Sequence, residues 1–225
     1  MVSGIGCSSR APGYVDFNTL HTTHGRAIPF ATGVKLAKPE MTVIVVTGDG
    51  DAAAIGGNHL IHAARRNIDL TVVVFNNWTY GMTSGQYSPT TPTGAFGTTA
   101  PYGNAERPFD LCKLAEAAGA TYVARGTAYH ARALPNLIEK AIQNKGFSLV
   151  EAITQCPVYY GRMNKIGTAV DMLKWQRDHA VSRKEAATLT PEEIGDRFVI
   201  GELYNQPAPE YCEQYETVIA KAQGR

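Results

Sequence analysis

The sequence lacks a hydrophobic run long enough to cross a membrane. Its longest apolar, β-branched runs lie at 43–46 and 72–75, whereas a membrane helix needs roughly 20 consecutive apolar residues. The amino terminus also lacks the basic region, apolar segment and cleavage site of a secretory signal. We therefore expect a soluble, cytoplasmic protein with no membrane contact.

The sequence also lacks a large excess of charge of one sign and a high density of cysteine residues. Lys plus Arg number 21 and Asp plus Glu 20, so no overall field attracts nucleic acid, and partners must be recognised locally. The four cysteines lie far apart, which excludes a disulfide scaffold and leaves thiols or metal ligands. Cys112 falls in the apolar stripe of a predicted helix and is expected to be buried; Cys212 is expected to be a thiol of the carboxyl-terminal tail.

What the sequence does contain is an alternation of strand and helix patterns. The continuous β-branched runs Thr42–Thr47 and Leu70–Phe75 predict strands covered on both faces, with a helix over 52–66 between them. The alternation continues with helices at 109–118 and 133–144 and strands at 121–124 and 147–153. This order predicts an α/β fold with a doubly wound, mostly parallel sheet, whose ligands bind at the carboxyl ends of the strands.

The chain divides into a predicted α/β domain over residues 1–160 and an irregular carboxyl-terminal extension over 161–225 that contacts a partner. Within the domain, 80–107 is rich in Gly, Thr, Pro and Ser, and a loop of this length predicts a binding loop. In the extension, Thr190-Pro191 predicts a helix start. From Gly201 onward no strand is expected before a short helix over 215–222.

Polar side chains follow the first two predicted strands. Asp49 stands in Gly48-Asp49-Gly50, and Asn77 in Asn76-Asn77 comes 28 positions later. Glycines let a backbone approach a diphosphate closely, and carboxylate and amide oxygens suit Mg²⁺, which is commonly shared between protein and phosphate. The pair predicts a metal-diphosphate site of the kind that thiamine diphosphate requires.

Other interpretations of these strings exist. Either string alone is an ordinary turn sequence. Residues 48–53 also satisfy the dinucleotide-binding pattern Gly-x-Gly-x-x-Ala, but two carboxylates would then face a pyrophosphate without a metal, and the next strand ends in Asn where a ribose-binding acid is expected. The phosphate loop Gly-x-x-x-x-Gly-Lys-Ser/Thr does not occur in the sequence.

Several strings in one order carry a family resemblance: 3–8 (SGIGCS), 21–26 (HTTHGR), 48–51 (GDGD), 76–77 (NN), 80–83 (YGMT) and 85–92 (GQYSPTTP). Together they resemble the β subunit of 2-oxoacid:ferredoxin oxidoreductases, and most of all the 2-oxoglutarate enzymes. The resemblance implies a thiamine diphosphate-binding fold of the diphosphate-domain type.

The resemblance also implies roles for individual residues. Mg²⁺ would be coordinated by the side chains of Asp49 and Asn77 and by the main-chain oxygen of Thr79. His24 would act in catalysis near the reactive ring of the cofactor, with His21 as a further candidate behind it. The residues implied in cofactor binding are Ile5, Gly6, Cys7, Ser8, His24, Gly50, Asp51, Gly81 and Met82.

A 4Fe-4S cluster is the third implied group, held by Cys7 and Cys156. A cubane cluster takes four thiolates, and in the family the other pair belongs to a Cys-x-x-Cys ahead of the string that contains Cys7. This sequence begins almost at that string, so either an amino-terminal segment is missing or the cluster is absent.

The implied activity is oxidative decarboxylation of a 2-oxoacid, best matched by 2-oxoglutarate, to the acyl-coenzyme A, with electrons passing to ferredoxin. The carboxylate that activates the cofactor would come from an α subunit, and Arg10 or Arg26 would face the distal carboxylate of the substrate. Pyruvate and branched 2-oxoacids stay open as substrates. The rivals are a non-redox thiamine enzyme such as an acetohydroxyacid synthase, and an inactive module that only binds its partner.

Overall fold

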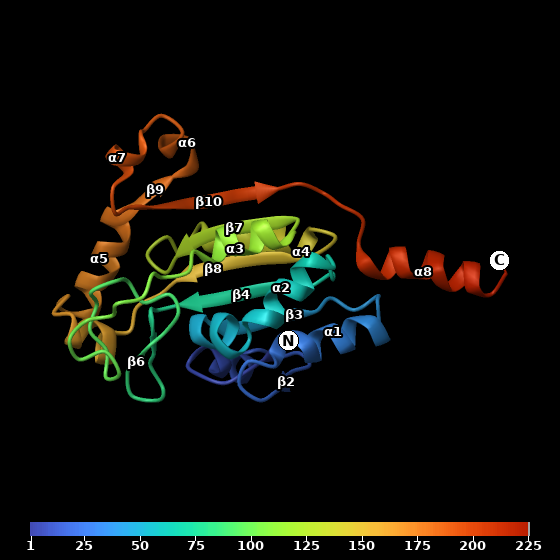
Figure 1. Cartoon of the computed structure of the whole chain (residues 1–225), viewed down its shortest axis with the longest axis horizontal. Coiled ribbons are helices and arrows are strands. Elements are labelled where there is room, and N and C mark those ends of the chain that lie inside the picture. Colours follow the sequence, from blue (N-terminus) through green and yellow to red (C-terminus); the bar gives the residue numbers. More distant parts are fainter. Residues whose placement is uncertain (225) are drawn as a thin grey trace.

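The computed structural model describes residues 1–224, built around an eight-stranded sheet in the order β2-β1-β3-β4-β8-β7-β10-β9 (Figure 1). The six strands from β2 to β7 in this order are parallel, β10 is antiparallel to β7, and β9 runs parallel to β10. The strands are β1 (Val2–Ser3), β2 (Leu20–His21), β3 (Ile44–Gly48), β4 (Thr71–Asn76), β7 (Tyr122–Thr127), β8 (Ser148–Ile153), β9 (Ala180–Ser182) and β10 (Phe198–Asn205).

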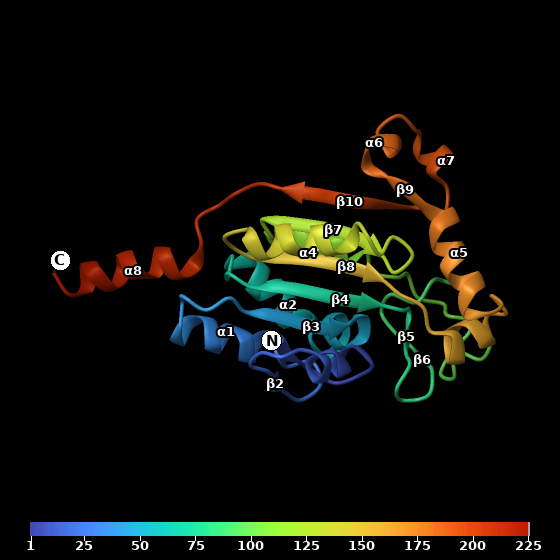
Figure 2. The same ribbon diagram turned by 180° about the vertical axis from the view of Figure 1, so that it is seen from behind.

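Helices cover both faces of this sheet, which confirms the predicted doubly wound, mostly parallel architecture (Figures 1 and 2). The helices are α1 (Ala27–Ala37), α2 (Gly57–Arg65), α3 (Leu111–Ala118), α4 (Leu134–Gln143), α5 (Ala169–His179), α6 (Arg183–Ala186), α7 (Pro191–Ile194) and α8 (Tyr211–Ala222). Short helical turns η1 (Ser8–Tyr14), η2 (Asp51–Ile55) and η3 (Pro157–Gly161) and a small hairpin of β5 (Thr79–Tyr80) with β6 (Gln86–Tyr87) complete the fold.

The core lies between the sheet and its helices. On one face, Val45, Val72 and Val74 are fully buried against α1, α2 and α3. On the other face, Tyr122 and Val150 pack against α4. Because successive residues of a strand point to opposite faces, a strand buried on both sides needs the continuous apolar pattern seen in the sequence.

The helix boundaries follow local chemistry. The Asp110 carboxylate accepts from the backbone amides of Cys112 and Lys113, each at 3.2 Å, and so caps α3 at its amino end. Gly119, with φ of 104°, ends the helix in the left-handed conformation that glycine adopts without penalty. The predicted start at Thr190-Pro191 is confirmed, where Thr190 and Glu193 form a capping box on α7.

The prediction for the end of the chain was wrong in its details. Residues 198–205 form β10, and the final helix begins at Tyr211 instead of 215. Gly201 interrupts the β-branched pattern of β10, and most of this strand is half-buried, so its apolar signal is weak. Three helices were also not anticipated: α1, which contains Pro29 and Gly33, α5 and the short α6.

The extension after residue 160 contributes to the same sheet through β10, and the division of the chain at that residue stays a prediction. At the other end, α8 projects away from the body of the molecule (Figure 1) and contains no buried residue. Among residues 1–224, no helix is both long and apolar enough to span a bilayer.

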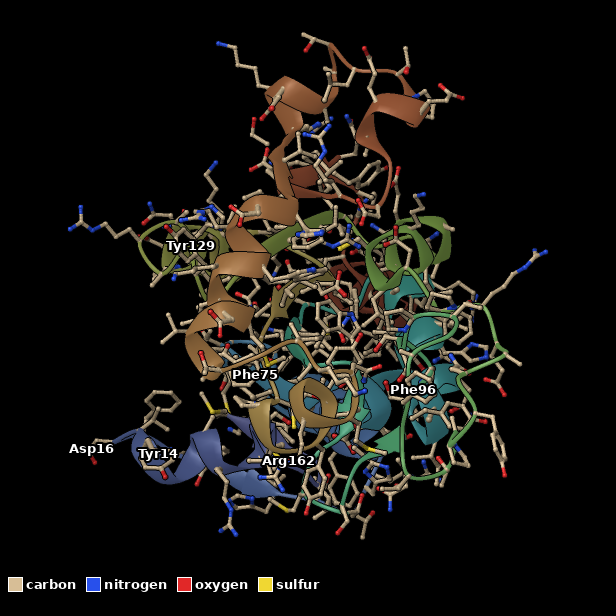
Figure 3. All side chains as sticks on the ribbon, turned by 90° about the vertical axis from the view of Figure 1, so that its left-hand side faces the viewer. Tyr14, Asp16, Phe75, Phe96, Tyr129 and Arg162 are labelled. Carbon is tan, nitrogen blue, oxygen red and sulfur yellow. The ribbon has the colours of Figure 1, made fainter. Side chains whose placement is uncertain are left out.

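The strands that matter for the site end together. Strands β3, β4 and β8 are parallel neighbours, so their carboxyl ends share one edge of the sheet. The loop at 80–107 and helix α5 gather at that edge (Figures 1 and 2). Figure 3 looks onto it: Phe75, at the end of β4, lies near the middle, with Tyr14 and Phe96 on the segments to either side.

Candidate functional site

A cavity of about 490 Å³ opens at the carboxyl edge of the sheet. It lies where ligands of doubly wound sheets bind. Its lining residues come from the amino-terminal segment, the ends of β3 and β4, the β5–β6 hairpin and the segment after β8: Ile5, Gly6, Cys7, Ser8, His24, Gly48, Asp49, Gly50, Asp51, Phe75, Asn77, Thr79, Tyr80, Gly81, Met82, Thr83, Thr154 and Gln155.

Asp49 is a buried carboxylate at the exit of β3. Its Oδ2 accepts from the hydroxyls of Ser88 and Thr90, the latter at 2.7 Å. Burial raises the pKa of Asp49 to about 6, against these hydrogen bonds, which lower it. Within residues 1–224 no Lys, Arg or His pairs with this carboxylate, so a bound cation would stabilise its charged form.

Asn77 and Thr79 stand on a tight turn at the exit of β4. The Oδ1 of Asn77 accepts from the amide of Thr79 at 3.2 Å, which bends the chain back toward β3. Trp78 between them has φ of 62°, in the left-handed region that a bulky residue seldom adopts. Such strain persists only where the surroundings hold it, and it clusters at binding sites.

Two glycines let neighbouring groups approach the cavity. A Cβ on Gly50 would overlap the ring of Tyr80, so glycine is required where that ring packs over the start of η2. A Cβ on Gly81 would lie 3.3 Å from the Cys7 sulfur and 3.4 Å from the Cys156 sulfur. Both sulfurs therefore flank the same short stretch of backbone.

Asp51 is buried beside the cavity and organises the loop before α1. Its Oδ1 accepts from the Gly25 amide at 2.6 Å and lies 2.8 Å from Nδ1 of His24; its Oδ2 accepts from the Thr47 hydroxyl at 2.7 Å. The His24 N–H is not aligned with that oxygen for a regular hydrogen bond, so the contact is an ion pair when the ring is protonated. A Cβ on Gly4 would overlap the Asp51 carboxylate.

The structure thus brings nearly all the predicted site residues to one cavity, while their roles stay predictions. Cys156 is buried just behind the lining at Gln155. His21 does not line the cavity: it lies in β2, exposed, with Nδ1 3.1 Å from the Ser3 hydroxyl. Neither Arg10 nor Arg26 lines the cavity; Arg26 bonds to the carbonyls of Gly25 and Ile55 instead.

The other two cysteines lie elsewhere. Cys112 is buried in α3, as expected, with its sulfur 3.3 Å from a carboxylate oxygen of Glu151, and burial raises the pKa of its thiol. Cys212 lies in α8 and is half-buried. The cavity therefore has two thiols beside it among the four in the sequence.

Sequence reasoning missed the residues that hold the site in shape. Ser88 and Thr90 were recognised only as part of a string, and Thr47 was counted as a strand residue. The only hint of these residues in the sequence was a hydroxyl side chain within or beside an apolar or glycine-rich segment. That hint becomes informative only when the fold brings residues 88–90 against Asp49. Tyr80, Thr154 and Gln155 also line the cavity.

This arrangement suits an anionic ligand that carries a metal ion. Asp49, Asn77 and the turn through Thr79 offer oxygen ligands on two adjacent strand exits, the donor set that Mg²⁺ prefers. The backbone around Gly50 leads into η2, where free amides favour a phosphate group. The residues present therefore fit a Mg²⁺-diphosphate cofactor.

Comparison with known proteins agrees with this geometry. The profile of the family described as "Thiamine pyrophosphate enzyme, C-terminal TPP binding domain" matches residues 4–152. The 2-oxoglutarate synthase subunit KorB of Methanothermobacter marburgensis is 57% identical over 225 residues, covering 100% of this chain and 79% of the relative. The 2-oxoacid:ferredoxin oxidoreductase 2 subunit beta of Aeropyrum pernix is 39% identical, covering 97% of this chain and 75% of the relative.

A solved structure is similar over the whole chain. It is that of the 2-oxoglutarate:ferredoxin oxidoreductase from Magnetococcus marinus, with 2-oxoglutarate, coenzyme A and succinyl-CoA bound. The TM-score is 0.87 at 36% identity, and the match covers 99% of this chain and 76% of that chain.

Proposed function

Since this chain belongs to the family of 2-oxoacid:ferredoxin oxidoreductase β subunits, we propose that it forms the thiamine diphosphate-binding half of an enzyme that oxidatively decarboxylates 2-oxoglutarate. The products are succinyl-coenzyme A, carbon dioxide and electrons passed to ferredoxin. The observation that supports this most directly is the buried carboxylate of Asp49, which lines the cavity and which no Lys, Arg or His within residues 1–224 pairs with.

The cofactor, when bound, supplies an electron sink for loss of CO₂ from the 2-oxoacid. The chain's own residues bind and orient it. Asp49, Asn77 and the Thr79 carbonyl would hold Mg²⁺, and the backbone at Gly50 and Gly81 would meet the diphosphate. Ile5, Gly6, Cys7, Ser8 and Met82 line the remaining wall. His24, which lines the cavity and lies 2.8 Å from Asp51, would hold a proton near the reacting atoms.

A redox role would use the paired sulfurs of Cys7 and Cys156. They flank Gly81 on one side of the cavity, so a 4Fe-4S cluster held there would lie next to the cofactor. Such a cluster takes four thiolates, so two further thiolates would be needed beside Cys7 and Cys156. The relatives are longer than the part that this chain matches.

The partner is the second subunit that a β subunit implies, and its proposed contact is the rim of the cavity. Ile5 and Met82 line the cavity and are 48% and 46% exposed, while Tyr14 and Phe17 on the same amino-terminal segment are 86% and 54% exposed. Exposed apolar side chains on a segment that lines a site favour a protein contact there. We propose an α subunit there, which would supply the carboxylate that activates the cofactor.

The test is turnover by the chain co-expressed with its α subunit. With Mg²⁺, thiamine diphosphate and coenzyme A, we expect reduction of ferredoxin or of a viologen dye with 2-oxoglutarate, and at least about tenfold lower kcat/KM with pyruvate or 2-oxoisovalerate, the scale of one lost charged contact. Asp49→Asn should abolish activity, whereas the exposed acid Glu192→Gln should not.

Turnover of another 2-oxoacid in place of 2-oxoglutarate would correct the substrate. Tight binding of the α subunit without turnover of any 2-oxoacid would favour the inactive-module alternative. Decarboxylation without reduction of an acceptor would favour a non-redox thiamine enzyme.

A further inference from the structure

A buried row of polar side chains crosses four neighbouring strands beneath the cavity. Strands β3, β4, β8 and β7 lie side by side. Each of these strands either contributes a residue to the row or ends next to a residue of the row. Buried polar groups are costly unless they are paired, so an unbroken row of this kind demands an explanation. From the surface inward its members are Asp110, Arg125, Glu151, Asn76, Thr90 and Asp49.

The outer part of the row is a compensated charge cluster. Arg125 donates from Nε to Glu151 Oε2 at 2.6 Å and from Nη2 to Asp110 Oδ1. Burial alone would lower the pKa of Arg125, but the adjacent Glu151, Cys112 and Asp110 together more than offset this and the pKa is raised. Oxygen and sulfur atoms of Asp110, Cys112 and Glu151 lie within 4.8 Å of one another, and the guanidinium supplies the cation of this group. The cluster is therefore fixed in charge and geometry.

The other oxygen of Glu151 sets the orientation of Asn76. Glu151 Oε1 accepts from Nδ2 of Asn76 at 2.7 Å, so the amide oxygen of Asn76 must face the opposite way. That oxygen accepts from the backbone amide of Trp78 at 3.1 Å and lies 2.9 Å from the Thr90 hydroxyl. Asn76 thus ties β8 to both the turn that carries Asn77 and the loop that carries Thr90.

Thr90 links this amide to the carboxylate of Asp49. Its Oγ1 lies 2.7 Å from Asp49 Oδ2 and 2.9 Å from Asn76 Oδ1. A hydroxyl has one proton to donate, so it serves one of these two acceptors at a time. The orientations of Asp49 and Asn76, on two different strand exits, are coupled through this one group.

We infer that Thr90 and Asn76 are positioning residues, which hold the Asp49 carboxylate and the turn of Asn77 at the separation that one metal ion requires, with Glu151 anchoring both to the sheet. This inference depends on the proposed function, because it assumes that Asp49 and Asn77 ligate Mg²⁺. Partners that orient metal ligands typically change metal affinity by about 10–100-fold when they are replaced. None of these three side chains needs to touch the metal or the cofactor.

The test measures metal affinity apart from activity. Mn²⁺ replaces Mg²⁺ as the probe, and free Mn²⁺ is counted by electron paramagnetic resonance in the assembled complex with thiamine diphosphate present. Thr90→Val keeps the shape of the side chain and removes the hydroxyl; it should weaken Mn²⁺ binding about 10–100-fold. Thr90→Ser keeps the hydroxyl and should stay within about threefold of the wild type.

Thr121→Val is the matched control. Thr121 is a buried threonine at the opposite edge of the sheet, whose hydroxyl donates to Asn67 Oδ1 at 3.2 Å. Its replacement removes the same kind of group and should lower stability similarly while leaving Mn²⁺ affinity unchanged. If Thr90→Val fails to assemble, Asn76→Ser tests the same contact between Asn76 and Thr90, because the shorter side chain no longer reaches the Thr90 hydroxyl. We expect it to weaken Mn²⁺ binding in the same range.

The outcomes separate the two hypotheses. If the Asp49→Asn variant binds Mn²⁺ as tightly as the wild type does, the proposed metal site is wrong. If Asp49→Asn abolishes binding while Thr90→Val and Asn76→Ser bind Mn²⁺ like the wild type, or no more weakly than Thr121→Val, the metal site stands and the positioning role is overturned. Loss in Thr90→Val with recovery in Thr90→Ser supports the inference.

Discussion

At the scale of single residues, the buried carboxylate of Asp49 lowers the free energy of unfolding, and a bound metal ion would remove this destabilisation. Burial raises its pKa from the ordinary 3.8 to about 6. Between these values the folded chain keeps a proton that the unfolded chain has released. The free energy of unfolding therefore falls as pH rises through this window, by up to about 3 kcal/mol, and the loss is complete above pH 6.

Asp49→Asn should remove this dependence. In chelator-treated protein we expect the variant to be more stable than the wild type at pH 8, by up to about 3 kcal/mol, and the difference to shrink as pH falls toward 4. Urea unfolding at a series of pH values measures it. Mg²⁺ with thiamine diphosphate should restore the wild type at pH 8 and leave the variant unchanged. A wild type that gains stability as pH rises from 4 to 8 relative to the variant would contradict the sign.

Gly4 offers a second test at this scale. A Cβ at this position would overlap the Asp51 carboxylate, which also holds Gly25 and faces His24. We expect Gly4→Ala to lower the free energy of unfolding by about 1–3 kcal/mol, the usual cost of overpacking. In an Asp51→Ala background the same change should cost clearly less, and equal costs in both backgrounds would show that the carboxylate is not the obstacle.

At the scale of elements, the carboxyl-terminal extension protects an edge of the sheet. Strand β10 pairs with β7, in which Tyr122, Val123 and Ala124 are almost completely buried. Without β10 the hydrogen-bonding edge of β7 is open, and an exposed apolar edge pairs with other chains. The extension is thus part of the sheet and not an appendage to it.

A chain ending at Asp196 should therefore aggregate. One ending at Gln214 keeps β10, Tyr211, which packs against the core, and the buried Glu210, whose carboxylate accepts from the Asp69 amide. It loses most of α8, which has no buried residue. We expect this second chain to stay monodisperse with nearly unchanged Tm. Light scattering and thermal unfolding compare the two, and equal behaviour would show that β10 does not guard the edge.

The elements also show which parts of the fold and of the site could be predicted from the sequence. Strands β3, β4 and β8 were predictable because a strand buried on both faces needs a continuous apolar run, and strand exits then place Asp49 and Asn77 at one edge. Strand β10 was not predictable, because the half-buried residues around Gly201 show little hydrophobic periodicity. The coupling of Thr90 to Asp49 was out of reach as well, because the two are brought together by a long loop whose path no periodicity encodes.

At the scale of the whole molecule, the question is what completes the site. The net charge is near zero, so recruitment of the α subunit should depend on the exposed apolar side chains of Ile5, Tyr14, Phe17 and Met82 more than on long-range attraction. Assembly should therefore change little between about 0.05 and 0.5 M salt. Tyr14→Ser with Phe17→Ser should weaken it, as measured by analytical ultracentrifugation, while Tyr102→Ser, which changes a 97% exposed side chain that does not line the cavity, should not.

The proposed cluster would also need thiolates beyond those that this chain places at the cavity. Cys7 and Cys156 flank Gly81, whereas Cys112 is buried in α3, where its pKa is raised well above the ordinary value and it cannot readily act as a thiolate. The 225-residue chain alone should accordingly bind iron far below one cluster per chain. A longer form that carries a further Cys-x-x-Cys should be brown and bind close to four irons.

In that longer form, Cys7→Ala or Cys156→Ala should strip the iron, and Cys112→Ala should retain it. Thiamine diphosphate binding should survive Cys156→Ala, because Cys156 lies behind the cavity wall and its proposed role is to carry electrons. Iron analysis, electron paramagnetic resonance and calorimetry of the three variants give the measurement. A full cluster that persists without both Cys7 and Cys156 would remove the redox half of the proposed function and leave the metal-diphosphate half standing on Asp49 and Asn77.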